Sequence, residues 1–250
     1  GVGVVPGRRG LHAALMRSNQ NRQDVRQAPP EPRLAPNGWW FDGVMLLLLA
    51  GITAGVAVPS PLTALDVTVR NFVDSHRPPA AENLAQALNY LGQELPLALV
   101  CVSVALALVW RQRTWEPVLP VLSAFVLSYA SLGALKLLTD RSAPHHGSVL
   151  LFSEPSAMSY PSGHAANAMI WYGVLAMFLI PLPAVLRGAW PRRLIWWAPV
   201  LVVGLASTYL GYHWVTDVIA GLVLGLIVVR LVRRQLWRRL RFPPGWSRCT

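Results

Sequence analysis

Two histidines and an aspartate in the second half of the chain have the types and spacing needed for phosphoryl transfer. His213 and Asp217 are four residues apart, so on a helix they would share one face and could contact each other. A carboxylate bonded to one imidazole nitrogen fixes the tautomer and leaves the other nitrogen as a nucleophile. His164 could then protonate the departing oxygen, which divides the nucleophile and acid roles between two histidines.

A second group of residues predicts a binding site for the phosphate itself. The tetrad Pro161–Ser162–Gly163–His164 opens an apolar stretch, where Ser162 is suited to cap a helix. The first-turn N–H groups of that helix, opened by Gly163, would form an anion site. Lys136, the only lysine of the chain, would add a point charge, although a lysine can also simply extend to the lipid–water interface.

The elements that must position these residues are membrane helices. The chain has 250 residues, of which 54% are hydrophobic and 13% charged, whereas a soluble domain has about 25% charged residues. This composition argues against a soluble enzyme and against a nucleic-acid-binding protein. Apolar stretches long enough for a helix to cross the hydrocarbon core, with flanking residues where needed, predict an all-α bundle of six transmembrane helices. These stretches cover residues 43–60, 95–110, 117–135, 165–186, 194–212 and 214–229.

The basic residues predict how the bundle is oriented. All but four of the 22 lysines and arginines fall in the first tail, in the loops after the second and fourth apolar stretches, and in the last tail. The positive-inside rule assigns these segments, and therefore both termini, to the cytoplasm. The opposite, extracytoplasmic face carries the other four, which are Arg70, Arg77, Lys136 and Arg141. The candidate site residues lie at helix ends on that face, so the site is expected to open outward.

Three regions follow from these patterns. Residues 1–38 are rich in Arg and Pro and predict a disordered cytoplasmic tail. Residues 39–235 form the membrane domain, and residues 236–250 form a second basic cytoplasmic tail. Within the domain, residues 64–92 are too polar to span the membrane, and their apolar spacing predicts short amphipathic helices along the outer surface.

At these residues the sequence resembles the type 2 phosphatidic acid phosphatase superfamily of membrane lipid phosphatases and phosphotransferases. The resemblance covers about residues 40–235. The tetrad at 161–164 matches the second motif of that family, and the remaining matches are Lys136 and Pro144 at the ends of the first motif and His213 and Asp217 in the third.

The resemblance implies a role for each matched residue. His213 would be the nucleophile that forms a phosphohistidine, Asp217 would orient it, and His164 would be the acid on the leaving group. Neither a metal nor another cofactor is required in that family. A purely structural His213–Asp217 pair is the alternative to these roles.

Two positions depart from the family pattern. Ala143 and Ser207 stand where the first and third motifs have arginines that grip phosphate oxygens. Arg141 lies two residues from the first of these positions, and it is either a substitute phosphate ligand or a residue at the lipid surface. Because a phosphodiester carries less charge than a monoester, the loss of cations favours a diester or a bulky head group, while a monoester stays open.

The sequence therefore predicts a bacterial lipid phosphatase of the cytoplasmic membrane. Its substrates would be phosphatidic acid-like lipids or polyprenyl phosphates or pyrophosphates. The alternatives are a phosphotransferase that uses an acceptor alcohol in place of water, and a catalytically silent protein that binds lipid phosphate. The expected partners are the lipid substrate and membrane lipids, with no nucleic acid and no obligate protein partner.

Overall fold

The computed structural model describes residues 38–179 and 189–236. These residues are helical and contain no β-strand, with one isolated bridge between Arg141 and Met158. The prediction of an all-α fold is confirmed for them. The tails predicted at 1–38 and 236–250 lie outside the described residues, apart from Gly38 and Leu236 at their borders.

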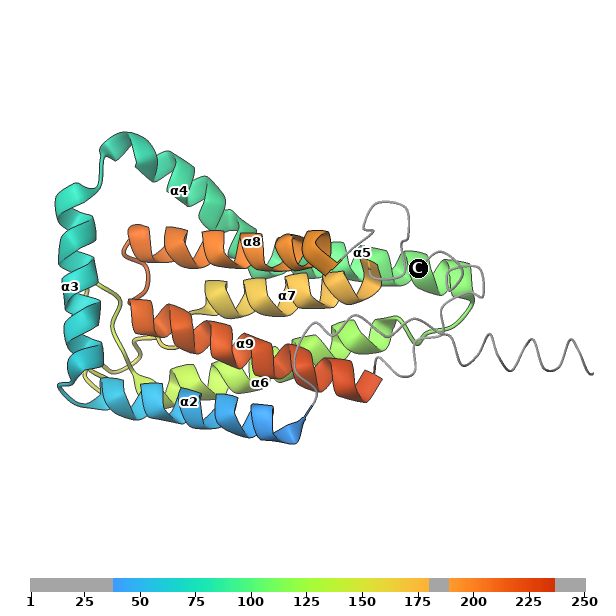
Figure 1. The fold of residues 1–250 in the computed structure, drawn as a ribbon, viewed down its shortest axis with the longest axis horizontal. Coiled ribbons are helices and arrows are strands. Elements are labelled where there is room, and N and C mark those ends of the chain that lie inside the picture. Colours follow the sequence, from blue (N-terminus) through green and yellow to red (C-terminus); the bar gives the residue numbers. More distant parts are fainter. Residues whose placement is uncertain (1–37, 180–188, 237–250) are drawn as a thin grey trace, which may run out of the picture.

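Six long helices lie side by side, and a shorter pair crosses one end of them (Figure 1). The long helices are α2 (Trp39–Ala57), α5 (Glu94–Gln112), α6 (Val118–Thr139), α7 (Gly163–Leu179), α8 (Ala189–Tyr209) and α9 (Val215–Leu236). The shorter pair is α3 (Pro61–His76) and α4 (Glu82–Asn89), with single 3₁₀ turns η1 (Pro79–Ala81) and η2 (Tyr90–Gly92).

Four helices in the described part of the chain are long and apolar enough to cross a membrane. They are α2, α5, α6 and the Val215–Arg234 part of α9. The described part of α7 has 17 residues, and the apolar part of α8 is limited to Trp196–Tyr209. The count of six transmembrane helices therefore stays a prediction.

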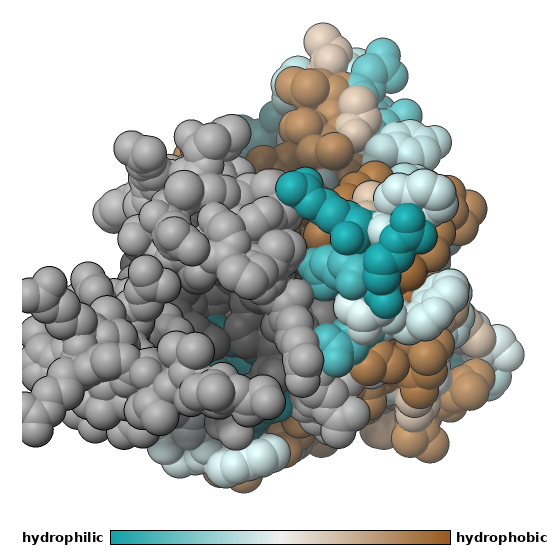
Figure 2. All heavy atoms as spheres, turned by 90° about the vertical axis from the view of Figure 1, so that its right-hand side faces the viewer, coloured by the Kyte–Doolittle hydropathy of each residue, from teal (hydrophilic) through white to brown (hydrophobic). Residues whose placement is uncertain are grey.

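The outer faces of the bundle are apolar, as expected for helices surrounded by lipid. Leu47 on α2, Leu99 on α5 and Leu122 on α6 are among many large hydrophobic side chains that are more than half exposed. Figure 2 looks onto the end of the bundle opposite α3, where hydrophilic residues gather beside hydrophobic flanks. Asp42 of α2 is buried there and pairs with Arg230 and Arg234 of α9.

The amphipathic segment forms the predicted short helices, of which α3 is the longest at 16 residues. Ser60 and Thr63 make a reciprocal capping box at its start, and Pro61 occupies its first turn. α3 lies across the end of the bundle where α2, α6 and α8 end and α7 and α9 begin (Figure 1). It can therefore contact the loops that carry the candidate site residues.

α7 is the central helix and packs against α5, α6, α8 and α9. Its close approach to α9 depends on small residues, because a Cβ at Gly221 would lie 2.4 Å from the Ser162 carbonyl oxygen. One turn further along, a Cβ at Gly225 would lie 2.9 Å from the Ala166 carbonyl oxygen. Such small-residue spacing lets membrane helices pack backbone to backbone. The start of α7 is thereby held directly beside the start of α9.

Candidate active site

A cavity of about 370 Å³ opens where α5, α6 and α7 meet the loop between α8 and α9. It brings together four of the residues that the sequence singled out, which are Lys136, Gly163, His164 and His213. The rings of His164 and His213 have their centroids 5.9 Å apart. The three helix ends expected to converge do so, and the cavity is completed by Gly92, Gln93, Glu94, Leu95 and Asn167.

His213 is held by the segment before α7. Its Nδ1 lies 3.1 Å from the Ser159 carbonyl oxygen and 3.3 Å from the Ser159 hydroxyl. Because a carbonyl can only accept a hydrogen bond, we assign the proton to Nδ1, which leaves a lone pair on Nε2. In a neutral imidazole with this tautomer, Nε2 is the nitrogen that has a lone pair available for nucleophilic attack.

Asp217 and His213 are in contact, as the spacing predicts, but the contact is not a direct hydrogen bond. The distance from Nδ1 to its Oδ2 is 3.8 Å, which is too long for a hydrogen bond. The reason is that His213 precedes the first turn of α9 and that Oδ2 is already occupied. This oxygen accepts from the Ser159 hydroxyl at 2.6 Å and from the Trp214 N–H at 3.1 Å. Ser159 thus connects the two residues, and sequence reasoning missed it.

Arg141 does not line the cavity. Its side chain is fully buried, with Nη1 donating to Asp217 and to the Thr216 hydroxyl, and Nη2 donating to Asp66 at 2.7 Å. Its Nε donates to the Val149 carbonyl at 2.8 Å. These contacts do not support the prediction that Arg141 binds phosphate or lies at the lipid surface. They make it a positioning residue for Asp217.

Asp66 of α3 is the other residue of this cluster that sequence reasoning missed. It is 1% exposed, and it accepts from the Thr216 N–H at 3.0 Å and the Thr216 hydroxyl at 2.5 Å as well as from Arg141. The sequence did contain a sign that Asp66 is buried, because Val69 and Val73 follow it by three and seven residues and therefore share its helix face. A carboxylate on the apolar face of an amphipathic helix needs a buried partner.

The start of α7 has the helix cap and the nearby lysine on which the predicted anion site depends. The Ser162 hydroxyl accepts from the Ala165 N–H at 3.3 Å, so Ser162 caps the helix and is itself fully buried. The N–H groups of Gly163 and His164 belong to the first turn, which has no intrahelical acceptors for them. Lys136 runs past Gly163 and donates to the Met158 carbonyl. A phosphate at this position would meet one ammonium group and the positive end of a helix.

The two positions without the family arginines have other partners. Ser207 is fully buried, and its hydroxyl donates to Asn89 of α4 at 2.6 Å. Ala143 lies in the loop before α7. The cavity is consequently lined by one permanent cation, Lys136, and one carboxylic acid, Glu94.

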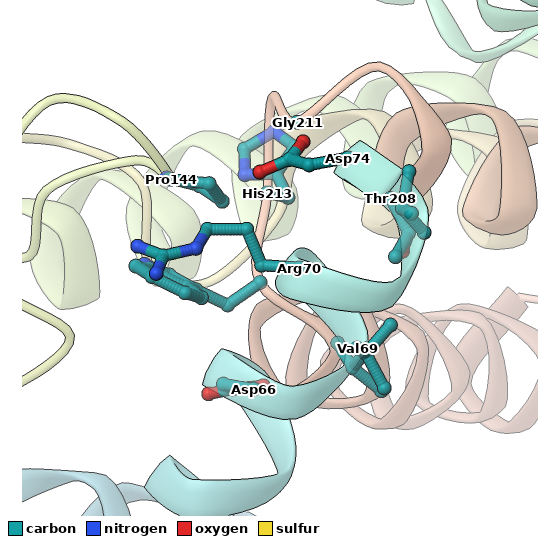
Figure 3. A pocket seen from close by; sticks show the side chains of 11 residues that line it. Asp66, Val69, Arg70, Asp74, Pro144, Thr208, Gly211 and His213 are labelled. Atoms are coloured by element: carbon teal, nitrogen blue, oxygen red, sulfur yellow. The ribbon is translucent and has the colours of Figure 1, made fainter. Parts of the chain in front are cut away.

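On the other side of His213 lies a small cavity of about 10 Å³, enough for one water molecule (Figure 3). Asp74 of α3 lies close to Gly211 and His213, whereas Arg70 extends toward Pro144 and lies over the Trp214 ring, 5.7 Å from its centroid (Figure 3). Asp74 also contacts His145, with an oxygen-to-Nε2 distance of 2.8 Å. α3 therefore closes this side of His213, and the 370 Å³ cavity with Lys136 and His164 lies on another side of the ring.

Tyr160 anchors the segment that holds His213. Its hydroxyl lies 2.7 Å from the Thr53 hydroxyl of α2, and its side chain is fully buried. Burial raises the pKa of Tyr160 to about 12, so the phenol stays neutral at physiological pH.

Among residues 38–179 and 189–236, no three His, Cys, Asp or Glu side chains are grouped so as to hold a metal ion.

The bundle and its cavity define an integral membrane protein with two histidines and a lysine gathered at one end of its helices. Its family follows from the sequence. Residues 117–241, half of the chain, match the sequence model of the PAP2 superfamily, and the chain belongs to that superfamily. The resemblance seen in the motifs is thereby confirmed.

Two of the similar proteins are named as phosphatases of a lipid phosphate. Phosphatidylglycerophosphatase B of Bacillus subtilis (strain 168) is 28% identical over 194 residues, which cover 77% of this chain and 94% of the relative. The crystal structure of a PAP2-type phosphatidylglycerolphosphate phosphatase from Bacillus subtilis superimposes with a TM-score of 0.70 at 25% identity, covering 81% of this chain and 98% of that one. Aquifex aeolicus LpxE shares the fold alone, with a TM-score of 0.50 at 19% identity over 67% of this chain and 94% of its own.

Proposed function

We propose that this protein hydrolyses the phosphate monoester of a membrane lipid through a covalent phosphohistidine on His213. The observation that carries the proposal is the contact between Nδ1 of His213 and the Ser159 carbonyl, which in the neutral imidazole places the proton on Nδ1 and the lone pair on Nε2. His213 lines a cavity that it shares with Lys136 and His164. A nucleophile, an acid and a phosphate site are thus present in one place.

The proposed reaction has two steps. In the first, Nε2 of His213 attacks phosphorus, and the bond from phosphorus to the lipid oxygen breaks while His164 gives that oxygen its proton. In the second, the neutral His164 takes a proton from water, whose oxygen attacks phosphorus and breaks the bond to Nε2. Lys136 and the N–H groups at the start of α7 would stabilise the negative charge in both transition states. No metal ion takes part in either step.

The substrate we propose is a monoester, against the preference for a diester that the missing arginines suggested. The two Bacillus relatives are named for the hydrolysis of phosphatidylglycerol phosphate, whose terminal phosphate is a monoester. A single lysine with a helix N-terminus also offers enough positive charge for one phosphate. Phosphatidylglycerol phosphate is therefore the first substrate to test, before phosphatidic acid and polyprenyl pyrophosphate.

The test is phosphate release by purified protein in detergent from these three lipids, with phosphatidylglycerol as a diester and His213→Ala as the blank. The proposal expects His213-dependent release of phosphate that persists in EDTA. It also expects a labelled phosphoprotein that is stable in alkali and labile in acid. A new diester without released phosphate would indicate a transferase, and a wild type that releases no more than the blank would refute the proposal.

We further propose that the protein lies in the cytoplasmic membrane with both termini inside and the cavity facing outward. The support is the placement of Arg111 and Arg113 at the end opposite Lys136 and Arg141. In a Cys249→Ser background, an impermeant maleimide added to spheroplasts should label Ser153→Cys and spare Arg113→Cys. Both positions are exposed, so the reverse pattern would mean the inverse orientation.

A further inference from the structure

Two oxygen atoms in the catalytic cavity are buried without a hydrogen-bond partner. They are Oε1 of Glu94, the first residue of α5, and Oδ1 of Asn167 on α7. Both residues line the cavity that contains His164 and His213, and Asn167 is only 8% exposed. The proposed mechanism uses neither of them. Buried polar atoms without a partner are rare in native proteins, and each one needs a reason.

Their position relative to the two histidines gives a reason. Asn167 follows His164 by three residues, so it lies on the same face of α7 one turn further into the bundle. Glu94 reaches the same cavity from the start of α5. Since His164 serves the leaving oxygen, the space beyond it is where the remainder of the lipid alcohol must lie.

The chemistry of the two groups defines what fits there. An ionised carboxylate accepts hydrogen bonds and donates none, and the amide oxygen of Asn167 is likewise an acceptor. A hydroxyl group on the leaving alcohol would supply the missing donor. A leaving group that is itself a phosphate presents mainly oxygen atoms that accept hydrogen bonds, so it would leave these two acceptors without a donor.

We propose that Glu94 and Asn167 form a hydroxyl-recognition subsite that selects lipid phosphates whose leaving alcohol carries a free hydroxyl. This inference rests on the proposed function and deepens it. A glycerol head group satisfies the requirement. Phosphatidic acid, whose leaving diacylglycerol has no other free hydroxyl, does not satisfy it, and neither does a polyprenyl pyrophosphate.

The experiment compares kcat/KM for phosphatidylglycerol phosphate and phosphatidic acid, matched in acyl chains and mixed with detergent. The variants are Glu94→Gln and Asn167→Leu. The control is Glu116→Gln, which removes a carboxylate that also has a buried unpartnered oxygen but lies in the connection between α5 and α6, at the other end of the bundle. Thermal unfolding of each variant checks that the bundle is intact.

We expect the wild type to prefer phosphatidylglycerol phosphate by about tenfold or more, the scale of one hydrogen bond to a charged group. Each site variant should reduce that ratio severalfold, and the Glu116→Gln control should leave it unchanged. A wild-type ratio near one, or a ratio that neither site variant alters, would overturn the subsite.

A binding measurement separates this inference from the proposed function. On the His213→Ala background, which cannot turn over, dissociation constants for the two short-chain lipids are compared with and without Glu94→Gln. A preference for phosphatidylglycerol phosphate that Glu94→Gln weakens supports the subsite even if the wild type releases no phosphate. Equal affinity for both lipids would refute it whatever the activity is.

Discussion

Arg141 and Asp66 form an ion pair with 2.7 Å between Nη2 and Oδ2, and neither side chain is exposed. The same guanidinium also holds Asp217, so one arginine joins α3 to the start of α9. The family motif would place an arginine at position 143, in the substrate site, whereas Arg141 sits two residues earlier in a structural cluster. The position of Asp217, and through Ser159 that of His213, therefore depends on α3, an element outside the three motifs.

Arg141→Met should destabilise the protein strongly. It would leave the buried carboxylates of Asp66 and Asp217 without their cation, and the loss of one partner from a buried pair costs about 3–5 kcal/mol. We expect a lower unfolding temperature in detergent and greatly reduced phosphate release. Arg113→Met, at an exposed position, is the control. A variant within about 1 kcal/mol of wild type would show that the cluster contributes little.

Asp217→Asn should retain measurable turnover. In serine proteases the equivalent change costs about 10⁴-fold because the histidine adopts the wrong tautomer. Here the Ser159 carbonyl fixes the tautomer independently of Asp217. We expect a loss of roughly 100-fold in kcat, intermediate between wild type and His213→Ala. Activity as low as that of His213→Ala would mean that the carboxylate, and not the carbonyl, controls the imidazole.

His164→Asn should separate the two steps of the reaction. A nitrophenolate leaves without a proton, so p-nitrophenyl phosphate needs no acid in the first step, whereas a lipid alkoxide does. We expect a burst of one nitrophenolate per protein followed by slow turnover, together with a loss of about 10²–10⁴-fold on lipid phosphate. Rapid mixing measures the burst. Normal steady-state turnover of both substrates would remove His164 from the mechanism.

Gly221→Ala should disturb the packing of α7 against α9. The added Cβ would lie 2.4 Å from the Ser162 carbonyl, so the helices must separate, at a cost of about 1–3 kcal/mol. Gly51→Ala on α2 is a matched control, because nothing lies within 4 Å of its added Cβ. Unfolding temperatures and phosphate release should fall for Gly221→Ala alone. Equal effects of the two changes would contradict the close contact.

Stability should decline at alkaline pH through Tyr160. Its folded pKa of about 12 exceeds the ordinary value of 10.0, so the folded state keeps a proton that the unfolded state loses between these values. The contribution of Tyr160 to the free energy of unfolding is fully present below pH 10. Roughly 2–3 kcal/mol of it is lost as the pH rises to 12. Tyr160→Phe should flatten the decline relative to Tyr129→Phe, which alters an exposed tyrosine. Parallel unfolding curves from pH 9 to 12 would contradict this.

The sequence by itself determined the class and the family, and it predicted which residues gather in the candidate site. Long charge-free stretches require helices in lipid, because the backbone there must satisfy its own hydrogen bonds. The tetrad at 161–164 and the spacing of His213 and Asp217 identify local chemistry that needs little context. Lys136, Gly163, His164 and His213 accordingly meet in one cavity, as the order of the helices implied.

Only the tertiary structure decided which partner each of these groups has. Ser159, Asp66 and Thr216 are separated in sequence by up to 150 residues, and their contacts depend on how α3 and α9 are packed. Sequence spacing could not show whether Arg141 binds phosphate or instead makes buried ion pairs within the protein. The burial of a side chain depends on the elements that surround it, and these are distant in sequence. For the same reason, the unpartnered oxygens of Glu94 and Asn167 are visible only once three helices enclose the cavity.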